Sequence, residues 1–76
     1  MNYRHLEAFE AVMKTGSMTL AGKRLFITQP AVSRLIIELE QELGFKLFER
    51  KKNKLICTDE NQLFFEEVEK SFIGTF

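Results

Sequence analysis

The chain has 76 residues, of which 45% are hydrophobic, and it contains eight Phe, one Pro and four Gly. A chain this short buries only about 60% of the surface that it exposes when unfolded, which excludes more than one small domain. Its apolar content excludes a disordered tail, and its net charge of zero excludes a uniformly basic nucleic-acid-binding surface.

Several other classes of protein are also excluded by composition. No apolar run approaches the about 18 residues of a membrane span, and the N-terminus lacks a secretory signal, so we expect a cytoplasmic protein without membrane contact. A single cysteine, Cys57, and a single histidine, His5, provide neither a disulfide nor the usual zinc ligands. With no paired nucleophile and base and no phosphate-binding glycine loop, we expect no enzyme, cofactor or metal. We expect His5 on the surface and Cys57 as a small buried residue.

Two helices are predicted in the first part of the chain. Apolar residues recur at helical spacing over residues 3–14, and Gly16 follows as a stop. Ser17 is a suitable N-cap for a second helix over residues 18–25. The residues expected to be buried are Leu6, Phe9, Val12, Met13, Met18, Ala21 and Leu25.

A third helix is predicted over about residues 28–43, after a turn at Phe26-Ile27. Thr28 is a suitable N-cap, and Pro30 lies in the first turn, where its missing amide costs little. The expected buried face consists of Val32, Leu35, Ile36, Leu39 and Leu43, and Gly44 ends the helix. Small and amide side chains open this helix in place of bulky ones. Two helices joined by a short turn in this way indicate a helix-turn-helix that inserts its second helix into a DNA groove.

A hairpin and a fourth helix are predicted next. Residues 45–50 and 54–57 alternate as strands do, around a polar stretch at 51–53. Thr58 is the expected N-cap for a helix over about residues 59–71, whose acidic start suits the helix dipole. The fold class is therefore mainly α: a winged helix-turn-helix with a three-helix core and a two-stranded wing over residues 1–58, then a linker helix over residues 59–76.

The zero net charge is a sum of two opposite segments. Residues 1–58 carry ten basic and six acidic side chains, whereas residues 59–76 carry one basic and five acidic side chains. The net charges are therefore +4 and −4, and the sign changes at Cys57-Thr58.

Several motifs together resemble a known family. They are Leu6-Glu7-Ala8-Phe9, Gly16-Ser17-Met18-Thr19, Thr28-Gln29-Pro30-Ala31-Val32-Ser33-Arg34, Leu39-Glu40, Leu43-Gly44, Leu47-Phe48-Glu49-Arg50 and Thr58. Over nearly its whole length the chain resembles the N-terminal DNA-binding domain of LysR-type transcriptional regulators. The tail, with Leu63-Phe64-Phe65-Glu66-Glu67-Val68 and Ser71-Phe72-Ile73-Gly74, is most similar to the branch of the lysine-biosynthesis and octopine-catabolism regulators.

Two residues depart from the family pattern. Gly22 stands where an alanine is common, and Asn61 stands where a glycine is common. We expect Gly22 to weaken its helix by up to about 1 kcal/mol relative to alanine. The resemblance also implies a longer C-terminal domain that binds a small-molecule effector, of which a basic amino acid or an opine is the suggested class. Nothing here corresponds to that domain, so we expect an excised fragment, with a natural short form as the alternative.

The start of the third helix is the predicted base-reading element. The candidate contacts are Thr28, Gln29, Pro30, Ala31, Ser33 and Arg34, and the resemblance implies the same positions. Gln29 suits adenine, Pro30 and Ala31 suit a thymine methyl group, and Ser33 suits a base edge or a phosphate. Arg34 is assigned a phosphate or mixed role. The alternative is a polar helix start that faces solvent.

The wing is the second predicted DNA contact. Arg50, Lys52 and Asn53 are the named candidates, beside Lys51 and Lys54, and they are expected on the DNA backbone or in the minor groove. The alternative is an ordinary solvated loop. Lys23 and Arg24 of the second helix are interpreted as surface charges, with a phosphate contact as the alternative.

The acidic fourth helix is predicted to form a dimer. Its acids would be repelled by phosphate, yet it carries more apolar surface than one helix face needs, and in the family this helix pairs with its twin. The candidate dimerisation residues are Leu63, Phe64, Val68 and Phe72. A homodimer would present two recognition helices about 34 Å apart to an interrupted palindromic operator in double-stranded DNA. The alternative is that this face packs entirely against the small core.

A second class of function remains open from the sequence. In a winged-helix protein-interaction module, the third helix would bind a partner protein and the basic wing would be incidental. Salt dependence separates the two functions, because specific DNA binding weakens steeply as salt rises.

Overall fold

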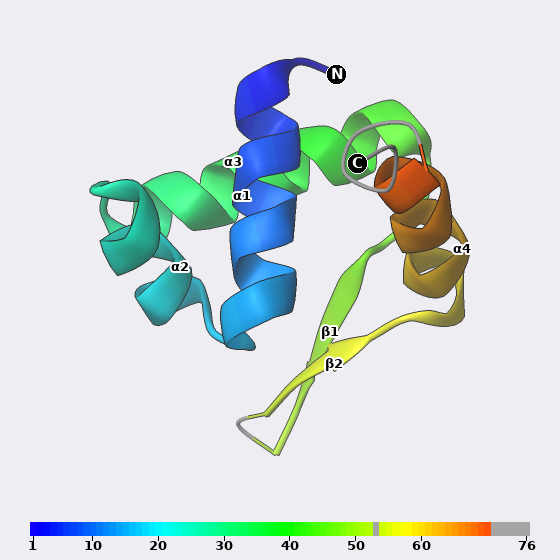
Figure 1. Ribbon diagram of the computed structural model, residues 1–76. Coiled ribbons are helices and arrows are strands. Elements are labelled where there is room, and N and C mark those ends of the chain that lie inside the picture. The colour runs from blue at the N-terminus through cyan, green and yellow to red at the C-terminus, as the bar shows by residue number, and fades with distance from the viewer. Residues whose placement is uncertain (53, 71–76) are drawn as a thin grey trace. The chain divides into compact units, whose positions relative to one another are not determined.

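The computed structural model describes residues 1–52 and 54–70 and divides the chain into two compact units, residues 1–44 and 45–76 (Figure 1). The expectations for Asn53, Phe72 and the end of the fourth helix at Ser71 lie outside the described residues. In the sequence the division between the two units follows Gly44, and a functional boundary at residue 58 remains a prediction.

The first unit contains three helices whose ends follow the local sequence signals. α1 spans Tyr3–Thr15 and ends at Gly16, whose φ of 70° is left-handed. α2 spans Met18–Leu25, and the Ser17 hydroxyl accepts a hydrogen bond from the backbone N–H of Leu20 at 3.1 Å. α3 spans Gln29–Leu43 and ends at Gly44, whose φ is 82°. The predicted caps of all three helices are therefore confirmed.

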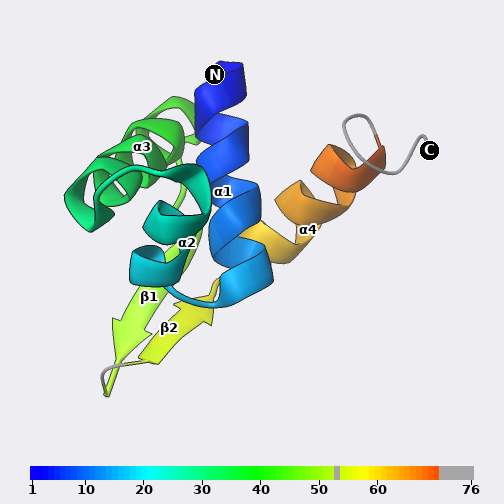
Figure 2. The same ribbon diagram turned by 60° about the vertical axis from the view of Figure 1, so that its left-hand side comes forward.

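The core of this unit lies where the three helices contact one another. α1 crosses α3, and α2 lies beside the C-terminal half of α1 (Figures 1 and 2). The buried apolar residues of the three helices are Ala8, Phe9, Ala11, Val12, Ala21, Val32, Ile36 and Leu39. Other residues that we expected to be buried are only half-buried: Leu6, Met13, Met18, Leu25, Leu35 and Leu43. Three short helices cannot enclose every apolar side chain on their faces, because a small domain has too little interior volume.

The prediction that His5 lies on the surface is wrong. The residue is only 6% exposed, and its Nε2 lies 2.9 Å from Oε1 of Glu38. Its Nδ1 accepts a hydrogen bond from the backbone N–H of Asn2 at 3.2 Å, while the Asn2 side chain accepts one from the backbone N–H of His5. Because Nδ1 is an acceptor, the proton of the neutral ring lies on Nε2 and is donated to Glu38. His5 thus completes a capping box at the start of α1 and joins this helix to α3.

A second carboxylate of α3 lies at the same end of α1. Oε1 of Glu42 is 3.6 Å from Nδ1 of His5, and the N-terminal ammonium group of Met1 donates a hydrogen bond to Glu42. This hydrogen bond holds the pKa of the Glu42 carboxyl below its usual range. The start of α1 is therefore held to α3 by polar contacts as well as by the apolar core.

The second unit contains a two-stranded antiparallel hairpin and α4. β1 spans Phe48–Lys51 and β2 spans Lys54–Cys57, and in their register Phe48 is opposite Cys57. The first strand therefore begins three residues later than predicted. Residues 45–47 contact the region of α4 instead: the ring of Phe45 packs edge to face on Phe64, with centroids 6.4 Å apart.

α4 spans Asp59–Val68, and Thr58 caps it as predicted. The Thr58 hydroxyl accepts from the backbone N–H of Asn61 at 3.1 Å and donates to the carbonyl of Lys46 at 2.6 Å. The fully buried Asn61 donates from Nδ2 to the carbonyl of Leu47 at 2.8 Å, and the backbone N–H of Thr58 donates to the same carbonyl. The amide that replaces the common glycine thus fastens α4 to the segment that enters β1.

The prediction that Cys57 is buried is also wrong, because this side chain is exposed. Alternation of side chains shows which residues share a face of a hairpin, but it does not show which face is covered. Over residues 1–52 and 54–70, no helix has the length and the apolarity needed to cross a bilayer.

Candidate nucleic-acid interface

The N-terminal part of α3 carries the predicted base-reading residues, which differ in their exposure. Thr28, Pro30 and Arg34 are exposed, whereas Gln29, Ala31 and Ser33 are half-buried. Val32 is fully buried, and residues two positions away on an α-helix lie about 200° around the axis. Packing of Val32 in the core therefore directs Pro30 and Arg34 away from it.

Thr28 has two available functions at this position. Its hydroxyl oxygen accepts a hydrogen bond from the backbone N–H of Ala31 at 3.3 Å, which caps the helix. The hydroxyl proton is not used by this contact and can be donated to a base edge or a phosphate. The first turn of α3 also contains no acidic residue, in contrast to the first turn of α4, which contains Asp59 and Glu60. The positive end of the α3 dipole is thus available to an anion.

Two basic residues lie on α2 at its C-terminal end. Lys23 and Arg24 are exposed, and neither forms an ion pair within residues 1–52 and 54–70. In the last turn their positive charges interact favourably with the negative end of the helix dipole, so the presence of basic residues here does not require a ligand. The same exposure leaves them accessible to a phosphate.

The hairpin carries a concentration of basic side chains. Arg50, Lys51, Lys52 and Lys54 are all exposed, and in the described part of the chain none of them has an ion-pair partner. Lys51 lies directly opposite Lys54 in the strand register. Like charges at directly opposite positions destabilise a hairpin unless an anion lies between or beside them. The end of this hairpin is therefore electrostatically suited to a polyanion.

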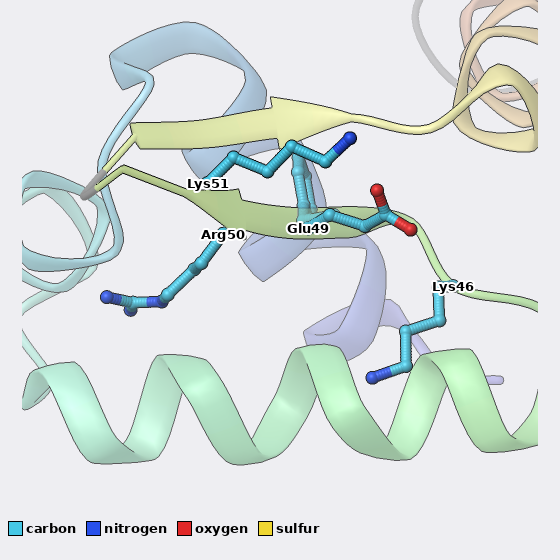
Figure 3. Close-up of a pocket in the computed structure, with 5 residues that line it drawn as sticks. Lys46, Glu49, Arg50 and Lys51 are labelled. Carbon is cyan, nitrogen blue, oxygen red and sulfur yellow. The ribbon is translucent and has the colours of Figure 1, made fainter.

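A shallow pocket lies beside β1 and adds a residue that the sequence analysis had not selected. It is lined by Lys46, Phe48, Glu49, Arg50 and Lys51. Figure 3 shows Arg50 and Lys51 leaving the strand in opposite directions, with Lys46 extending on the same side as Arg50. Lys46 precedes the strand and is separated from the Arg50–Lys54 cluster in sequence, so only the path of the chain into β1 brings it to this pocket.

The predicted dimerisation residues differ in their exposure. Leu63 is 69% exposed, and Phe64 is half-buried against Phe45. Val68 is 7% exposed, so little of its surface is accessible to a second chain. Among the described candidates, Leu63 is the residue with the most accessible apolar surface.

The sequence model of the family described as "Bacterial regulatory helix-turn-helix protein, lysR family" matches residues 3–62. This chain belongs to the LysR family. The match covers all three helices of the first unit and the hairpin, together with the first residues of α4. The predicted family and its winged-helix fold are therefore confirmed.

Individual LysR-family relatives agree with this assignment. The chain is 49% identical over 74 residues to the octopine catabolism/uptake operon regulatory protein OccR of Rhizobium meliloti. It is 55% identical over 71 residues to the regulatory protein NocR of Agrobacterium fabrum. These matches cover 97% and 93% of this chain but 25% and 24% of the relatives. The chain thus spans about a quarter of the length of the curated relatives that it matches.

The solved structure of a protein–DNA complex is also similar. The crystal structure of the BenM_DBD/benA site 1 DNA complex superposes with a TM-score of 0.88 at 39% identity, covering 99% of this chain and 84% of that one. Similarity at this level of identity extends to sequence as well as to fold.

Proposed function

We propose that this chain is the sequence-specific, double-stranded DNA-binding domain of a bacterial transcriptional regulator of the LysR family. The observation that carries the proposal is the N-terminal part of α3, whose first turn contains no acidic residue and in which Thr28, Pro30 and Arg34 are exposed. The BenM_DBD relative, which is described as a DNA complex, supports it. The proposed role is binding without catalysis, in the cytoplasm, where bacterial DNA lies.

The residues of α3 have separate proposed roles. Gln29 is assigned to an adenine in the major groove, and Pro30 with Ala31 to a thymine methyl group, because these side chains match the groups on those bases. Ser33 is assigned to a base edge or a phosphate, and Arg34 to a phosphate or a mixed contact. The contacts with bases determine the sequence preference, and the contacts with phosphates determine the register of the protein on the duplex.

The hairpin has a different proposed role, in which it adds affinity rather than sequence preference. Arg50 and Lys52 are assigned to the phosphate backbone, and Asn53, which lies between the two strands in the sequence, to the backbone or the minor groove. Lys46 joins them, because it lines the same pocket as Arg50. Each phosphate that these cations neutralise releases counterions, so their contribution decreases as salt rises.

A homodimer is proposed to form through α4. The acidic residues of this helix disfavour contact with phosphate, while the exposed Leu63 gives a second copy an apolar surface to cover. Two chains then place two α3 helices in successive major grooves, about 34 Å apart, on an interrupted palindrome. In a longer protein, a C-terminal domain would bind the small-molecule effector.

The test of this function is a selection of genomic fragments bound by the 76-residue chain at near-physiological salt, followed by alignment of the recovered sites. Enrichment of an interrupted palindrome is the expected result. DNA retained only at low salt, with no enriched sequence, would instead favour a protein-interaction module.

Two substitutions test the division of roles. Gln29→Ala is expected to reduce affinity for the selected operator by about 5-fold to 160-fold while affinity for random DNA stays unchanged, since one lost base contact costs about 1–3 kcal/mol. Lys52→Ala is expected to weaken both complexes equally and to lower the salt dependence by about one counterion. Competition binding with fluorescent duplexes measures both ratios. Equal losses for the two variants would contradict the assigned roles.

A further inference from the structure

Gly22 is buried in α2 without a conformational need for glycine. Left-handed glycines in the described chain are Gly16 and Gly44, so Gly22 has an ordinary helical backbone. Glycine in a helix interior is less favourable than alanine, which is common at this position in the family. The space around Gly22, rather than its backbone angles, must therefore explain the residue.

A side chain at this position would meet the turn between α2 and α3. A Cβ atom on Gly22 would lie 2.7 Å from the carbonyl oxygen of Ile27, 3.3 Å from the carbonyl carbon of Thr28 and 3.4 Å from the nitrogen of Gln29. The first of these distances is shorter than any normal contact, and all three atoms belong to the backbone. The backbone N–H of Ile27 also donates to the carbonyl of Gly22 at 2.9 Å, so the turn is held against α2. The sequence-based expectation that Gly22 only weakens its helix is therefore incomplete.

The atoms that approach Gly22 are joined directly to the start of α3. The carbonyl of Thr28 accepts from the backbone N–H of Val32 at 3.1 Å, and its hydroxyl accepts from that of Ala31 at 3.3 Å. A shift of residues 27–29 therefore either moves the first turn of α3 or breaks its cap. That turn carries the proposed base-reading side chains, while the exposed Lys23 and Arg24 remain on α2.

We infer that Gly22 is a positioning residue for DNA reading, which lets the first turn of α3 lie closer to α2 than an alanine allows. The separation between the two helices sets where the base-reading residues lie relative to the rest of the first unit. A buried residue that cannot touch DNA thereby affects the choice of operator. This inference rests on the proposed function and specifies how its reading element is placed.

The experiment compares the 76-residue chain with Gly22→Ala and with Thr19→Ala, an exposed position on the same helix. Backbone amide shifts, recorded without DNA, test the geometry. Gly22→Ala is expected to move the amides of residues 27–31 more than any others, whereas Thr19→Ala should leave them in place. Trimethylamine N-oxide is added if the Gly22 variant is partly unfolded, because it favours the folded state.

Binding is then measured for a duplex recovered by selection with the unaltered chain and for a random duplex of the same length. Gly22→Ala is expected to lose about tenfold in affinity for the selected duplex, as for one mismatched base pair, with unchanged affinity for the random one. Equal losses on the two duplexes, which leave the ratio of the two affinities unchanged, would indicate a merely structural role and overturn the inference. If the amide shifts are confined to α2, the inference is overturned, even when no operator has been found. If the shifts occur at residues 27–31 as expected but the selection enriches no DNA sequence, the result counts against the proposed function alone.

Discussion

Phe26 has two unfavourable features, a left-handed backbone and an exposed aromatic ring, and substitutions can distinguish the cost of each. This residue ends α2 in a left-handed conformation, with φ of 60°, and its side chain is 94% exposed. A residue with a Cβ in this conformation costs about 1–2 kcal/mol, and glycine is usual there because it has no Cβ. Phe26→Gly should therefore stabilise the fold.

The size of the gain follows from three contributions. Relief of the left-handed strain gives about 1–2 kcal/mol. The greater freedom of glycine in the unfolded chain offsets about 0.5–1 kcal/mol of this. Loss of the ring costs about 0.3 kcal/mol, because 6% of a Phe surface of about 200 Å² is roughly 10 Å², at about 25 cal/mol per Å². The net expectation is about 0.5 kcal/mol in favour of Phe26→Gly, or a rise of about 2–4 °C in Tm for a domain of this size.

Urea unfolding followed by circular dichroism, together with thermal melts, measures this change. Phe26→Ala is the matched control, since it removes the ring but keeps the Cβ and hence the strain. Its stability should lie within about 0.5 kcal/mol of the unaltered chain. If Phe26→Gly were no more stable than Phe26→Ala, the left-handed backbone would not be the source of the cost and the reasoning would be refuted.

Two further substitutions test polar contacts in the two units. His5→Ala should lower the free energy of unfolding by about 1–3 kcal/mol, because a buried ring and its hydrogen bonds to α1 and α3 are lost. Urea unfolding measures this change, and the control Arg4→Ala, at an exposed position, should change the free energy of unfolding by less than about 0.5 kcal/mol. Equal effects of the two substitutions would contradict the described contacts. Lys54→Glu should stabilise the chain without DNA by about 0.5–1 kcal/mol, because repulsion from Lys51 becomes attraction. The same variant should bind DNA more weakly and with a smaller salt dependence. A stability gain that persists in about 1 M salt would exclude this electrostatic cause.

The sequence predicted the helices well because their ends depend on neighbouring residues. Gly16 and Gly44 adopt the left-handed conformations expected of helix stops, and Ser17, Thr28 and Thr58 cap the helices that follow them. Each of these signals acts within four residues, so the local sequence contains all the interactions that determine where a helix begins or ends.

Most of the errors arise from tertiary packing, which the local sequence does not describe. His5 is buried because Glu38, 33 positions later, accepts its hydrogen bond. The strand expected from residue 45 starts at Phe48, because Phe45 instead packs on the ring of Phe64. Gly22 contacts a turn whose path depends on the packing of α2 against α3, which helical periodicity does not describe. Lys46 was missed as a site residue because it precedes the basic stretch 50–54, and the path of the chain into β1 brings it to the same pocket as Arg50.

The hydrogen bonds around Leu47 have a mechanical consequence. Its carbonyl accepts from the backbone of Thr58 and from the buried side chain of Asn61, at the point where the chain enters the hairpin and where α4 begins. Two hydrogen bonds to one carbonyl group therefore connect the start of α4 to the segment that enters the hairpin. A displacement of the first turn of α4 relative to the entry into β1 would therefore have to break these two hydrogen bonds or move both elements together.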